Sequence, residues 1–352
     1  MNYKETLFFV AKCLTINHEA HNKRIVEETL QSNTIDWDAI VKLSNAHYVF
    51  PALYCNLKRA SFLSYLPEDL VDYMKYITAL NRERNEKIIA QAKELNTLLL
   101  KNHITPIFLK GTANLLDNLY EDIAERMLGD IDFMISDESY NQTVMILSKN
   151  QYNYKNSLLD DLGLGKHHPR MTHKNKIAAV EVHFRIVNIP YDHYLNYNTI
   201  KKNLQKTKDQ VLILSDINQI LHTVFNKQTN DRGYWMKTIS LRNYYDLFLL
   251  SKKTNTLKSI QSIEKYFNIL NSFLASCNFV FNNISSIHFK DDKKAKTYVS
   301  KVNEFLVSPK KMKFNKAKWN FYFKTKIRFK KLKLAFINKN ARKHLYNFLL
   351  RH

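Results

Sequence analysis

Two aspartates separated by one residue form the clearest chemical feature of this sequence. Asp130 and Asp132 stand in the segment GDIDF, with an apolar isoleucine between them. Residues i and i+2 of a β-strand point to the same face of a sheet. Two neighbouring carboxylates repel each other, and each raises the pKa of the other unless a cation neutralises them. The pair therefore indicates a divalent-metal site with oxygen ligands, although a solvated strand end explains it equally well when the pair is taken alone.

A second polar strand follows in the segment EVHFRI. Glu181, His183 and Arg185 alternate with apolar residues, so one face of this strand is polar. Such a strand either lines a cleft or lies at a sheet edge that faces water. Glu181 adds a third carboxylate to Asp130 and Asp132. Three carboxylates can hold two Mg²⁺ ions, which clamp the attacking and leaving oxygens of a phosphoryl displacement.

A turn that precedes both strands offers groups suited to phosphate. The segment IFLKGTANLL runs from a short apolar stretch through Lys110, Gly111 and Thr112 into a predicted helix, in a chain with only 5 glycines. Backbone N–H groups at a helix N-terminus, with a nearby hydroxyl, bind phosphate oxygens. An ordinary strand-to-helix turn has the same local pattern, but its combination with the three acids is more specific for nucleotide chemistry.

Around these motifs the sequence predicts a fold of the α+β or α/β class. Short apolar strands and helices alternate from residue 103 to 186, which indicates a small sheet with helices. Apolar residues recur at helical spacing over 70–102, 210–228 and 241–253, and a shorter helical segment at 35–57 is broken near Pro51. The predicted divisions are a helical region (1–102), a nucleotidyltransferase core (103–205), a second helical region (206–290) and a basic tail (291–352).

The order of the motifs resembles that of the DNA polymerase β-like nucleotidyltransferase superfamily, which has a Gly-Ser/Thr turn, an Asp-x-Asp strand and a third acid. The chain is more closely similar to a bacterial family of uncharacterised nucleotidyltransferases. The similar segments are FLKGTANLLDNLYEDIAERMLGDIDFMI, VEVHFRI, ILHTVFN and LRNYYDLFLL, and the resemblance as a whole covers about residues 35–253. The resemblance implies a polymerase β-like core, a small mixed sheet with helices, between helical flanking regions.

The resemblance also implies roles for single residues. Asp130, Asp132 and Glu181 would be the catalytic residues and the ligands of Mg²⁺, with Mn²⁺ as an alternative, and Glu181 would help to deprotonate the acceptor. Two positions depart from the family pattern: Glu181 stands where Asp is more usual, and Asn226 stands where a second histidine is usual. The residues implied in binding the NTP are Lys110, Gly111, Thr112, Gly129 and His183.

Some of these side chains have a second interpretation. Lys110 can equally cap its strand or pair with an acid, and His183 can be a structural histidine. The segment KHHPR (166–170) is expected to be an exposed loop, with contact to the triphosphate or the acceptor as the alternative.

Three positions outside the motifs also have structural interpretations. Arg126 is expected at the surface, with phosphate neutralisation as the alternative. Arg242 and Asp246 are four residues apart on a predicted helix and are expected to form a salt bridge or a packing contact. Tyr120 is expected in the core or in the wall of a cleft.

The composition suggests the partners and the compartment. The chain has 352 residues and a net charge of +22, which favours an acidic partner such as a nucleotide, nucleic acid or anionic membrane. Cys13, Cys55 and Cys277 are odd in number and lack C-x-x-C spacing, which argues against a disulfide framework or a zinc site. We read no signal peptide and no transmembrane segment. The expected location is cytoplasmic, with the inner face of the membrane as a peripheral alternative.

The C-terminal tail carries most of the net charge. Residues 305–352 contain 15 Lys and Arg residues and no Asp or Glu. Basic residues mixed with aromatic rings suit nucleic acid, where rings stack on bases, and they also suit an anionic membrane surface. A solvated basic extension is the third interpretation. The interleaved aromatic residues are Phe314, Trp319, Phe321, Tyr322, Phe323, Phe329 and Phe336.

These features together predict an enzyme that moves a nucleoside monophosphate from an NTP to an acceptor hydroxyl or phosphate and releases pyrophosphate. The acceptor stays open among a small molecule, a sugar phosphate, a peptide and tRNA. Two other functions also stay open. One is a non-catalytic module that holds RNA or a membrane, and the other is a toxin that nucleotidylates tRNA or a protein. The three acids favour an enzyme over the non-catalytic module.

Overall fold

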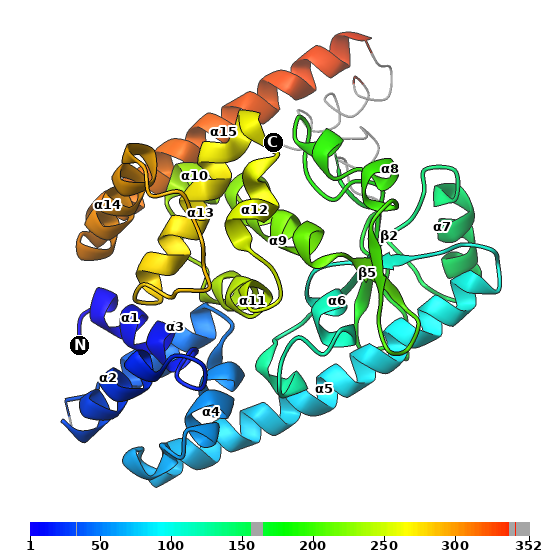
Figure 1. The fold of residues 1–352 in the computed structure, drawn as a ribbon. Coiled ribbons are helices and arrows are strands. Elements are labelled where there is room, and N and C mark those ends of the chain that lie inside the picture. The colour runs from blue at the N-terminus through cyan, green and yellow to red at the C-terminus, as the bar shows by residue number, and fades with distance from the viewer. Residues whose placement is uncertain (33, 156–164, 338–341, 343–352) are drawn as a thin grey trace.

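The computed structural model describes residues 1–32, 34–155, 165–337 and 342. A five-stranded mixed sheet stands at one side of a larger body of helices (Figure 1). This arrangement confirms the expected combination of a small mixed sheet with helical regions on either side of it in the sequence. Within the described residues, no helix is both long enough and apolar enough to cross a membrane.

The sheet brings the two polar strands together. Its order is β3-β2-β1-β5-β4; β2 is parallel to β3 and β1 is parallel to β5, whereas β1–β2 and β4–β5 are antiparallel. The motifs GDID and EVHFRI therefore lie on adjacent strands at one side of the sheet. The strands are β1 (Ile107–Phe108), β2 (Asp130–Met134), β3 (Ala179–His183), β4 (Leu204–Lys206) and β5 (Leu212–Leu214).

The segment 210–228 contains a strand where the sequence pattern predicts a continuous helix. β5 pairs with β1, and α9 (Asp216–Phe225) begins only after Ser215, whose hydroxyl accepts a hydrogen bond from the Asn218 N–H at 3.4 Å. A short apolar run such as residues 211–214 is compatible with either a strand or a buried helix. The sequence around it does not show that it pairs with β1, which lies about a hundred residues earlier in the chain. The sheet therefore extends beyond residue 205, the predicted end of the core.

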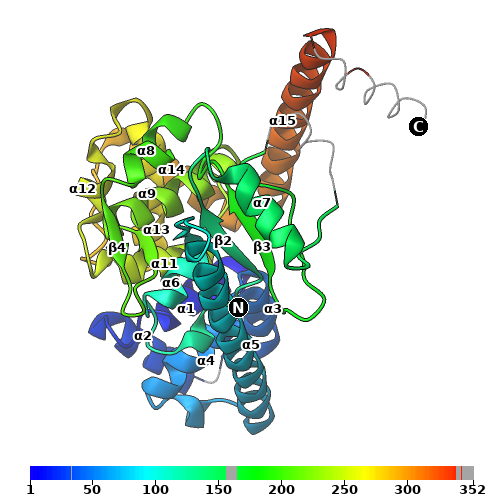
Figure 2. The same ribbon diagram turned by 90° about the vertical axis from the view of Figure 1, so that its right-hand side faces the viewer.

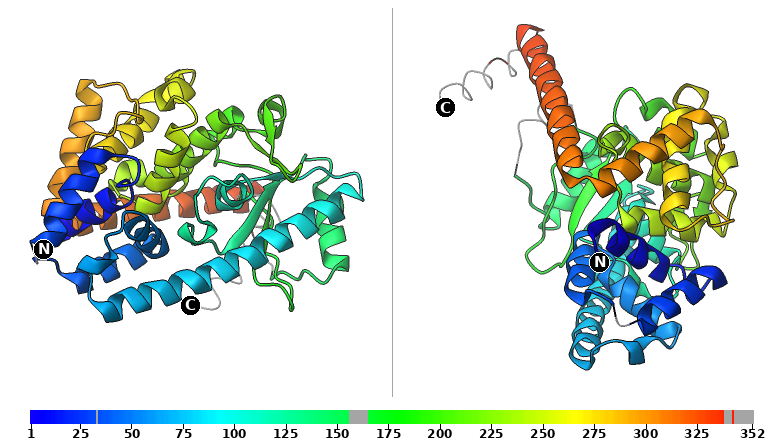
Figure 3. Two further views of the ribbon diagram at one scale, coloured as in Figure 1. Left: turned by 60° about the horizontal axis from the view of Figure 1, so that its bottom comes forward. Right: turned by 90° about the vertical axis from the view of Figure 1, so that its left-hand side faces the viewer.

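The first hundred residues are helical, as expected. Pro51 lies in the first turn of α4, where proline is tolerated, so the chain breaks before the proline rather than at it. The 33-residue α5 then runs from these helices to the sheet (Figures 1 and 3). The helices are α1 (Tyr3–Cys13), α2 (Ala20–Gln31), α3 (Trp37–Ala46), α4 (Phe50–Arg59) and α5 (Glu68–Leu100).

Two hydrophobic cores hold the molecule together. In the smaller core, Ile88 and Leu95 of α5 pack with Phe108 and Phe133 of the sheet. The larger core joins the N-terminal helices to the C-terminal helices and reaches the sheet at Ile107. The sheet is thereby fixed between α5 and the helical body, which leaves the polar face of β2 and β3 for other contacts.

The remaining helices connect the strands or follow the sheet. The described part of the basic tail is not an irregular extension, because it forms α14 and α15, and α15 alone has 29 residues. Residues 338–341 and 343–352 of the tail lie outside the described part of the chain. The helices are α6 (Lys110–Leu116), α7 (Tyr140–Lys149), α8 (Tyr197–Ile200), α10 (Gly233–Met236), α11 (Leu241–Ser251), α12 (Thr256–Gln261), α13 (Phe267–Val280), α14 (Lys293–Val307) and α15 (Pro309–Ile337).

Candidate active site

The pairing of β2 with β3 places the predicted acids on one face. Asp132 lies opposite Glu181 and Met134 lies opposite His183 in this parallel pair. Side chains alternate along a strand, so Asp130, Asp132, Glu181 and His183 project to the same side. The intervening residues, such as Ile131, Phe133, Val180 and Val182, are fully buried on the opposite side, against α5.

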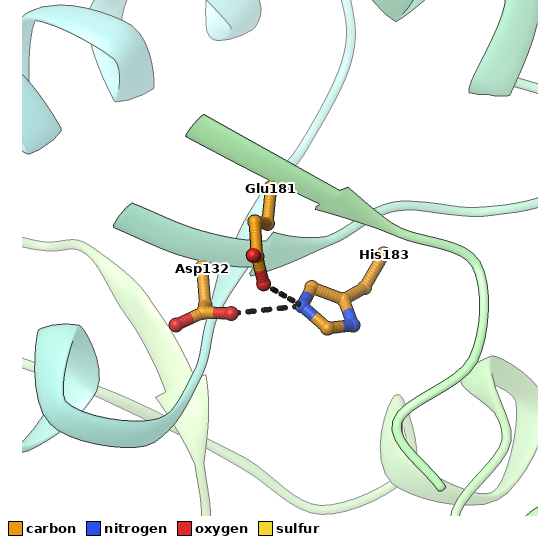
Figure 4. Close-up of side chains that lie close together, drawn as sticks. All are labelled: Asp132, Glu181 and His183. Carbon is orange, nitrogen blue, oxygen red and sulfur yellow. Dashed lines mark hydrogen bonds and ion pairs between the residues drawn. The ribbon is translucent and has the colours of Figure 1, made fainter. Parts of the chain in front are cut away.

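Three of these side chains form a cluster that fits a divalent cation. The Nε2 atom of His183 lies 2.9 Å from Asp132 Oδ1 and 3.6 Å from Glu181 Oε2 (Figure 4). One potential ligand atom from each of the three residues lies within 4.8 Å of the others. Asp132 is 4% exposed and His183 is 0% exposed, so these polar atoms are largely withdrawn from water. Carboxylate oxygens with one imidazole nitrogen form a common donor set for transition metals and are compatible with Mg²⁺.

The second ring nitrogen of His183 favours a ligand role for the first. Its Nδ1 atom lies 3.1 Å from the backbone carbonyl oxygen of Arg185. A carbonyl oxygen only accepts hydrogen bonds, so the Nδ1–H donates to it, and Nε2 is the ring nitrogen that faces the two carboxylates. This backbone contact is the type of support that fixes the tautomer of metal-binding histidines.

Lys110 extends its ammonium group into the same cluster. Its Nζ lies 2.5 Å from Asp132 Oδ1 and 3.6 Å from Glu181 Oε2. Burial by itself would raise the pKa of Asp132, but Lys110 and His183 hold that pKa well below its usual range. Burial also acts to lower the pKa of Lys110, but the two acids raise it above its ordinary value. The pairing with an acid, one of the roles expected from the sequence, is therefore present.

The loop 165–170 lies against this cluster rather than away from it. Arg170 forms an ion pair with Asp130 and lies 3.8 Å from Glu181. His167 Nε2 lies 3.7 Å from Glu181 Oε2. His168 is only 8% exposed, so the expectation of a simple exposed loop is wrong for this segment. Backbone hydrogen bonds to β3 hold it in place, which a loop-like sequence does not reveal.

The comparison with known families gives the class of protein. Residues 33–277 match the model of a family described as uncharacterised nucleotidyltransferase. The chain belongs to this family. The match covers α3 to α13 and leaves out α1, α2, α14 and α15. Members are described as transferases of nucleotidyl groups, so the family supports the transferase class expected from the sequence.

The chain is also similar to one curated protein. An uncharacterized protein of Plasmodium falciparum (isolate 3D7) is 28% identical over 246 residues, which cover 68% of the present chain. The chain spans 14% of the length of that relative.

The Gly-Thr turn of the nucleotidyltransferase is tightly packed. A Cβ atom on Gly111 would lie 2.8 Å from Leu128 Cδ1 and 3.3 Å from a guanidinium nitrogen of Arg126. Thr112 is 2% exposed, and its hydroxyl donates to the Asp130 carbonyl oxygen at 3.2 Å. The same hydroxyl accepts from the Asp132 N–H at 3.3 Å. In this structure the turn thus positions β2 under the acid cluster.

Lys110 and Gly129 each have a backbone feature that bears on ligand binding. Lys110 has a φ of 54°, in the left-handed region that L-residues rarely adopt. Such backbone conformations occur often at functional sites, where the surrounding structure holds them. A Cβ atom on Gly129, in contrast, would meet no atom of the described residues within 4 Å. The space beside Gly129 can therefore accept part of a ligand.

A buried ion pair supports the turn from behind. Arg126 is 7% exposed and its guanidinium lies 3.0 Å from Asp246, so the expected surface position is wrong. Tyr120 donates to the same carboxylate at 2.6 Å, which confirms its expected buried position. Arg242 instead stacks over the ring of Tyr48 at 4.8 Å. Asp246 thus pairs with a distant arginine on the chain segment before β2 and not with its helical neighbour.

A cleft of about 850 Å³ lies beside the loop 165–170, and two of its lining residues, His167 and Arg170, also contact the acids. The residues that line it include Tyr154, Lys166, His167 and Arg170. Burial and the nearby charge of Lys110 lower the pKa of Lys166 to about 8. Cations on this side of the cluster suit an anionic ligand such as a phosphate chain.

Sequence reasoning missed His222 in α9. This histidine is 3% exposed, and its Nε2 has no hydrogen-bond partner among the described residues. Burial, together with the charges of Lys110 and His183, holds the pKa of His222 well below its usual range. The segment ILHTVFN contains this histidine, but the sequence does not show that His222 lies near Lys110 and His183. That position depends on how α9 packs against the sheet.

Proposed function

We propose that the chain is a metal-dependent enzyme that transfers a nucleoside monophosphate from an NTP to an acceptor hydroxyl or phosphate. The observation that carries this proposal is the cluster of Asp132, Glu181 and His183 on adjacent strands, in a chain that belongs to a nucleotidyltransferase family. An oxygen of the acceptor attacks the α-phosphorus, the bond to the β-phosphate oxygen breaks, and pyrophosphate leaves.

The chain's own residues have distinct roles in this reaction. Asp132, Glu181 and His183 Nε2 would hold Mg²⁺, with Mn²⁺ as the alternative. The metal would neutralise phosphate oxygens and lower the pKa of an acceptor hydroxyl. Glu181, at the rim of the cluster, accepts the proton that this hydroxyl releases. Asp130, which pairs with Arg170 in this structure, would be a further ligand if Arg170 contacted phosphate instead, and three acids would then be available for two metals.

The triphosphate would lie between the acid cluster and the cleft. Lys110 and Arg170 provide positive charge on this side, and the open space beside Gly129 gives the phosphates access to β2. Gly111 and Thr112 act through the packing of the turn, which keeps β2 in register. The acceptor is a small molecule, a sugar phosphate, a peptide or tRNA.

The test combines nucleotide binding with transfer. Calorimetry with ATP, GTP, CTP and UTP should detect binding of at least one nucleotide that requires Mg²⁺. Asp132→Asn should abolish this binding, while Asp137→Asn, an exposed aspartate just after β2, should preserve it. Labelled NTPs incubated with the protein and a cell extract should label an acceptor, and Asp132→Asn should reduce the rate by about 10²-fold or more. Full transfer activity in Asp132→Asn would contradict the mechanism.

One observation favours a second function, a non-catalytic binding module. The ammonium of Lys110 already neutralises Asp132 at 2.5 Å, an arrangement that needs no metal. In such a module this ion pair would be permanent. Absence of metal-dependent nucleotide binding in the native chain, with an unchanged unfolding temperature on addition of Mg²⁺, would favour the module over the enzyme.

A further inference from the structure

The helix α15 lies outside the family match and projects beyond the rest of the molecule (Figures 2 and 3). Its first half is attached through one face. Trp319 and Phe323 pack against Trp235 of α10, and Asn315 donates a hydrogen bond to the Trp235 carbonyl oxygen at 3.1 Å. The guanidinium of Arg232 stacks over Phe323 at 4.5 Å. These contacts fix the rotation of α15 about its own axis.

A neighbouring face of α15, about 110° around the helix axis from the attached one, carries an apolar stripe that faces solvent. At 100° per residue, the side chains of this stripe fall within an arc of about 100°. The stripe extends over most of the helix and its apolar members are nearly all aromatic, but Lys311, Lys318 and Thr325 fall within the same arc. Its members, with their exposed fractions, are Phe314 (75%), Phe321 (73%), Tyr322 (50%), Phe329 (63%), Leu332 (41%) and Phe336 (80%).

Basic side chains border the stripe along both edges. Lys324 and Arg328 lie at one edge, and Lys326 and Lys333 lie at the other; all four are exposed. The segment 305–352 contains no acidic residue. The helix thus has an apolar face for an oily environment and long cationic side chains that can keep their charges at a polar boundary.

We propose that α15 lies on an anionic membrane surface, with the exposed stripe in the boundary between headgroups and acyl chains. Acidic headgroups complement the charge of the two basic edges. Transfer of the phenylalanine rings out of water lowers the free energy of the bound state. A second copy of the chain fits this face less well, because two strongly cationic helices would repel each other.

The spacing of the rings argues against nucleic acid as the occupant. Phe314 and Phe321, like Phe329 and Phe336, are seven residues apart, which is about 10 Å along a helix. Successive stacked bases are about 3.4 Å apart, so such rings do not form a continuous stacking platform. Phenylalanine also offers no hydrogen bond to a base edge.

The test measures binding of the full chain to vesicles. Phosphatidylcholine vesicles that contain phosphatidylserine should sediment the native chain, phosphatidylcholine alone should not, and added salt should weaken the binding. The triple variant Phe321→Ser/Phe329→Ser/Phe336→Ser should lose about tenfold or more in apparent affinity, because it removes apolar area from the boundary. Tyr76→Ser, which alters an exposed aromatic residue on α5, should bind as the native chain does.

A reporter distinguishes insertion from simple charge attraction. Tryptophan fluorescence of Phe321→Trp should shift to the blue when anionic vesicles are added. The proposal is overturned if the native chain ignores anionic vesicles, or if the triple variant binds them as tightly as the native chain. It is also overturned if the stripe variant loses affinity for single-stranded RNA but not for vesicles, or if it converts a dimer to a monomer without changing vesicle binding.

Discussion

Gly111 and Gly129 show how two glycines near one site can have different functions. The first packs against Leu128 and the buried Arg126, whereas the second faces open space. A bulky side chain at Gly111 must displace an arginine that is held by Asp246. Tight packing therefore explains the glycine at position 111. Open space for a ligand beside the strand explains the glycine at position 129.

A matched pair of variants tests this difference. Gly111→Val should lower the free energy of unfolding by about 1–3 kcal/mol, because it overpacks a buried position. Gly129→Ala should leave the unfolding temperature unchanged but weaken Mg²⁺-dependent nucleotide binding. Thermal unfolding followed by circular dichroism, and calorimetric titration of the nucleotide, measure the two effects. Unaltered nucleotide affinity in Gly129→Ala would place the phosphates elsewhere.

At the scale of elements, His47 joins the N-terminal helices to α11. It ends α3, and its Nδ1 accepts a hydrogen bond from the Leu241 N–H at 3.3 Å. Burial, with the charges of Lys227 and Lys316, lowers the pKa of His47 from 6.5 to about 4. A neutral imidazole is therefore part of the contact between these elements.

The low pKa of His47 predicts that the contact between α3 and α11 weakens in acid. The unfolded chain binds a proton at His47 below a pH of about 6.5, whereas the folded chain does so only near 4. The free energy of unfolding should therefore fall as the pH is lowered through this window. Urea unfolding at several pH values should show a shallower dependence in His47→Gln than in the native chain. Equal slopes for the two proteins would show that His47 does not contribute.

The whole molecule is organised around a core that is shared by distant parts of the chain. Leu7 and Leu53 belong to the same buried cluster as Ile107 of the sheet and Phe273 of α13. The divisions that we propose along the sequence (1–102, 103–205, 206–290 and 291–352) are therefore segments with different composition. We do not expect them to behave as independently folding units.

This shared core predicts the behaviour of a fragment. Residues 103–290 alone lose α5, which covers the sheet, and the N-terminal part of the larger core. The fragment should lack a cooperative unfolding transition in urea, while the full chain should unfold with coincident transitions by circular dichroism and tryptophan fluorescence. A fragment with a sharp transition of its own would show that the core can fold without its neighbours.

Several parts of the site were accessible from local pattern. The alternation in GDIDF and EVHFRI predicted that Asp130 and Asp132 share a face, and that Glu181 and His183 share one. That alternation also contained the signal for His183 as a third member of the cluster with Asp132 and Glu181, because it lies two residues from Glu181 on the same strand. A contact of His183 with the nucleotide stays a prediction, and the pairing of β2 with β3 brings its Nε2 to 2.9 Å from Asp132.

The sequence by itself determined which residue types stand on the polar faces of two strands, the helical flanks, the basic tail and the resemblance to a family. Tertiary structure decided which of these groups meet. It paired Lys110 with Asp132 and Arg126 with Asp246, moved the 165–170 loop against the acids, added β5 to the sheet and turned one aromatic face of α15 outward. The physical reason is that strand alternation and helical spacing are properties of neighbouring residues. Ion pairs, strand partners and burial depend instead on segments brought together by the shared hydrophobic core.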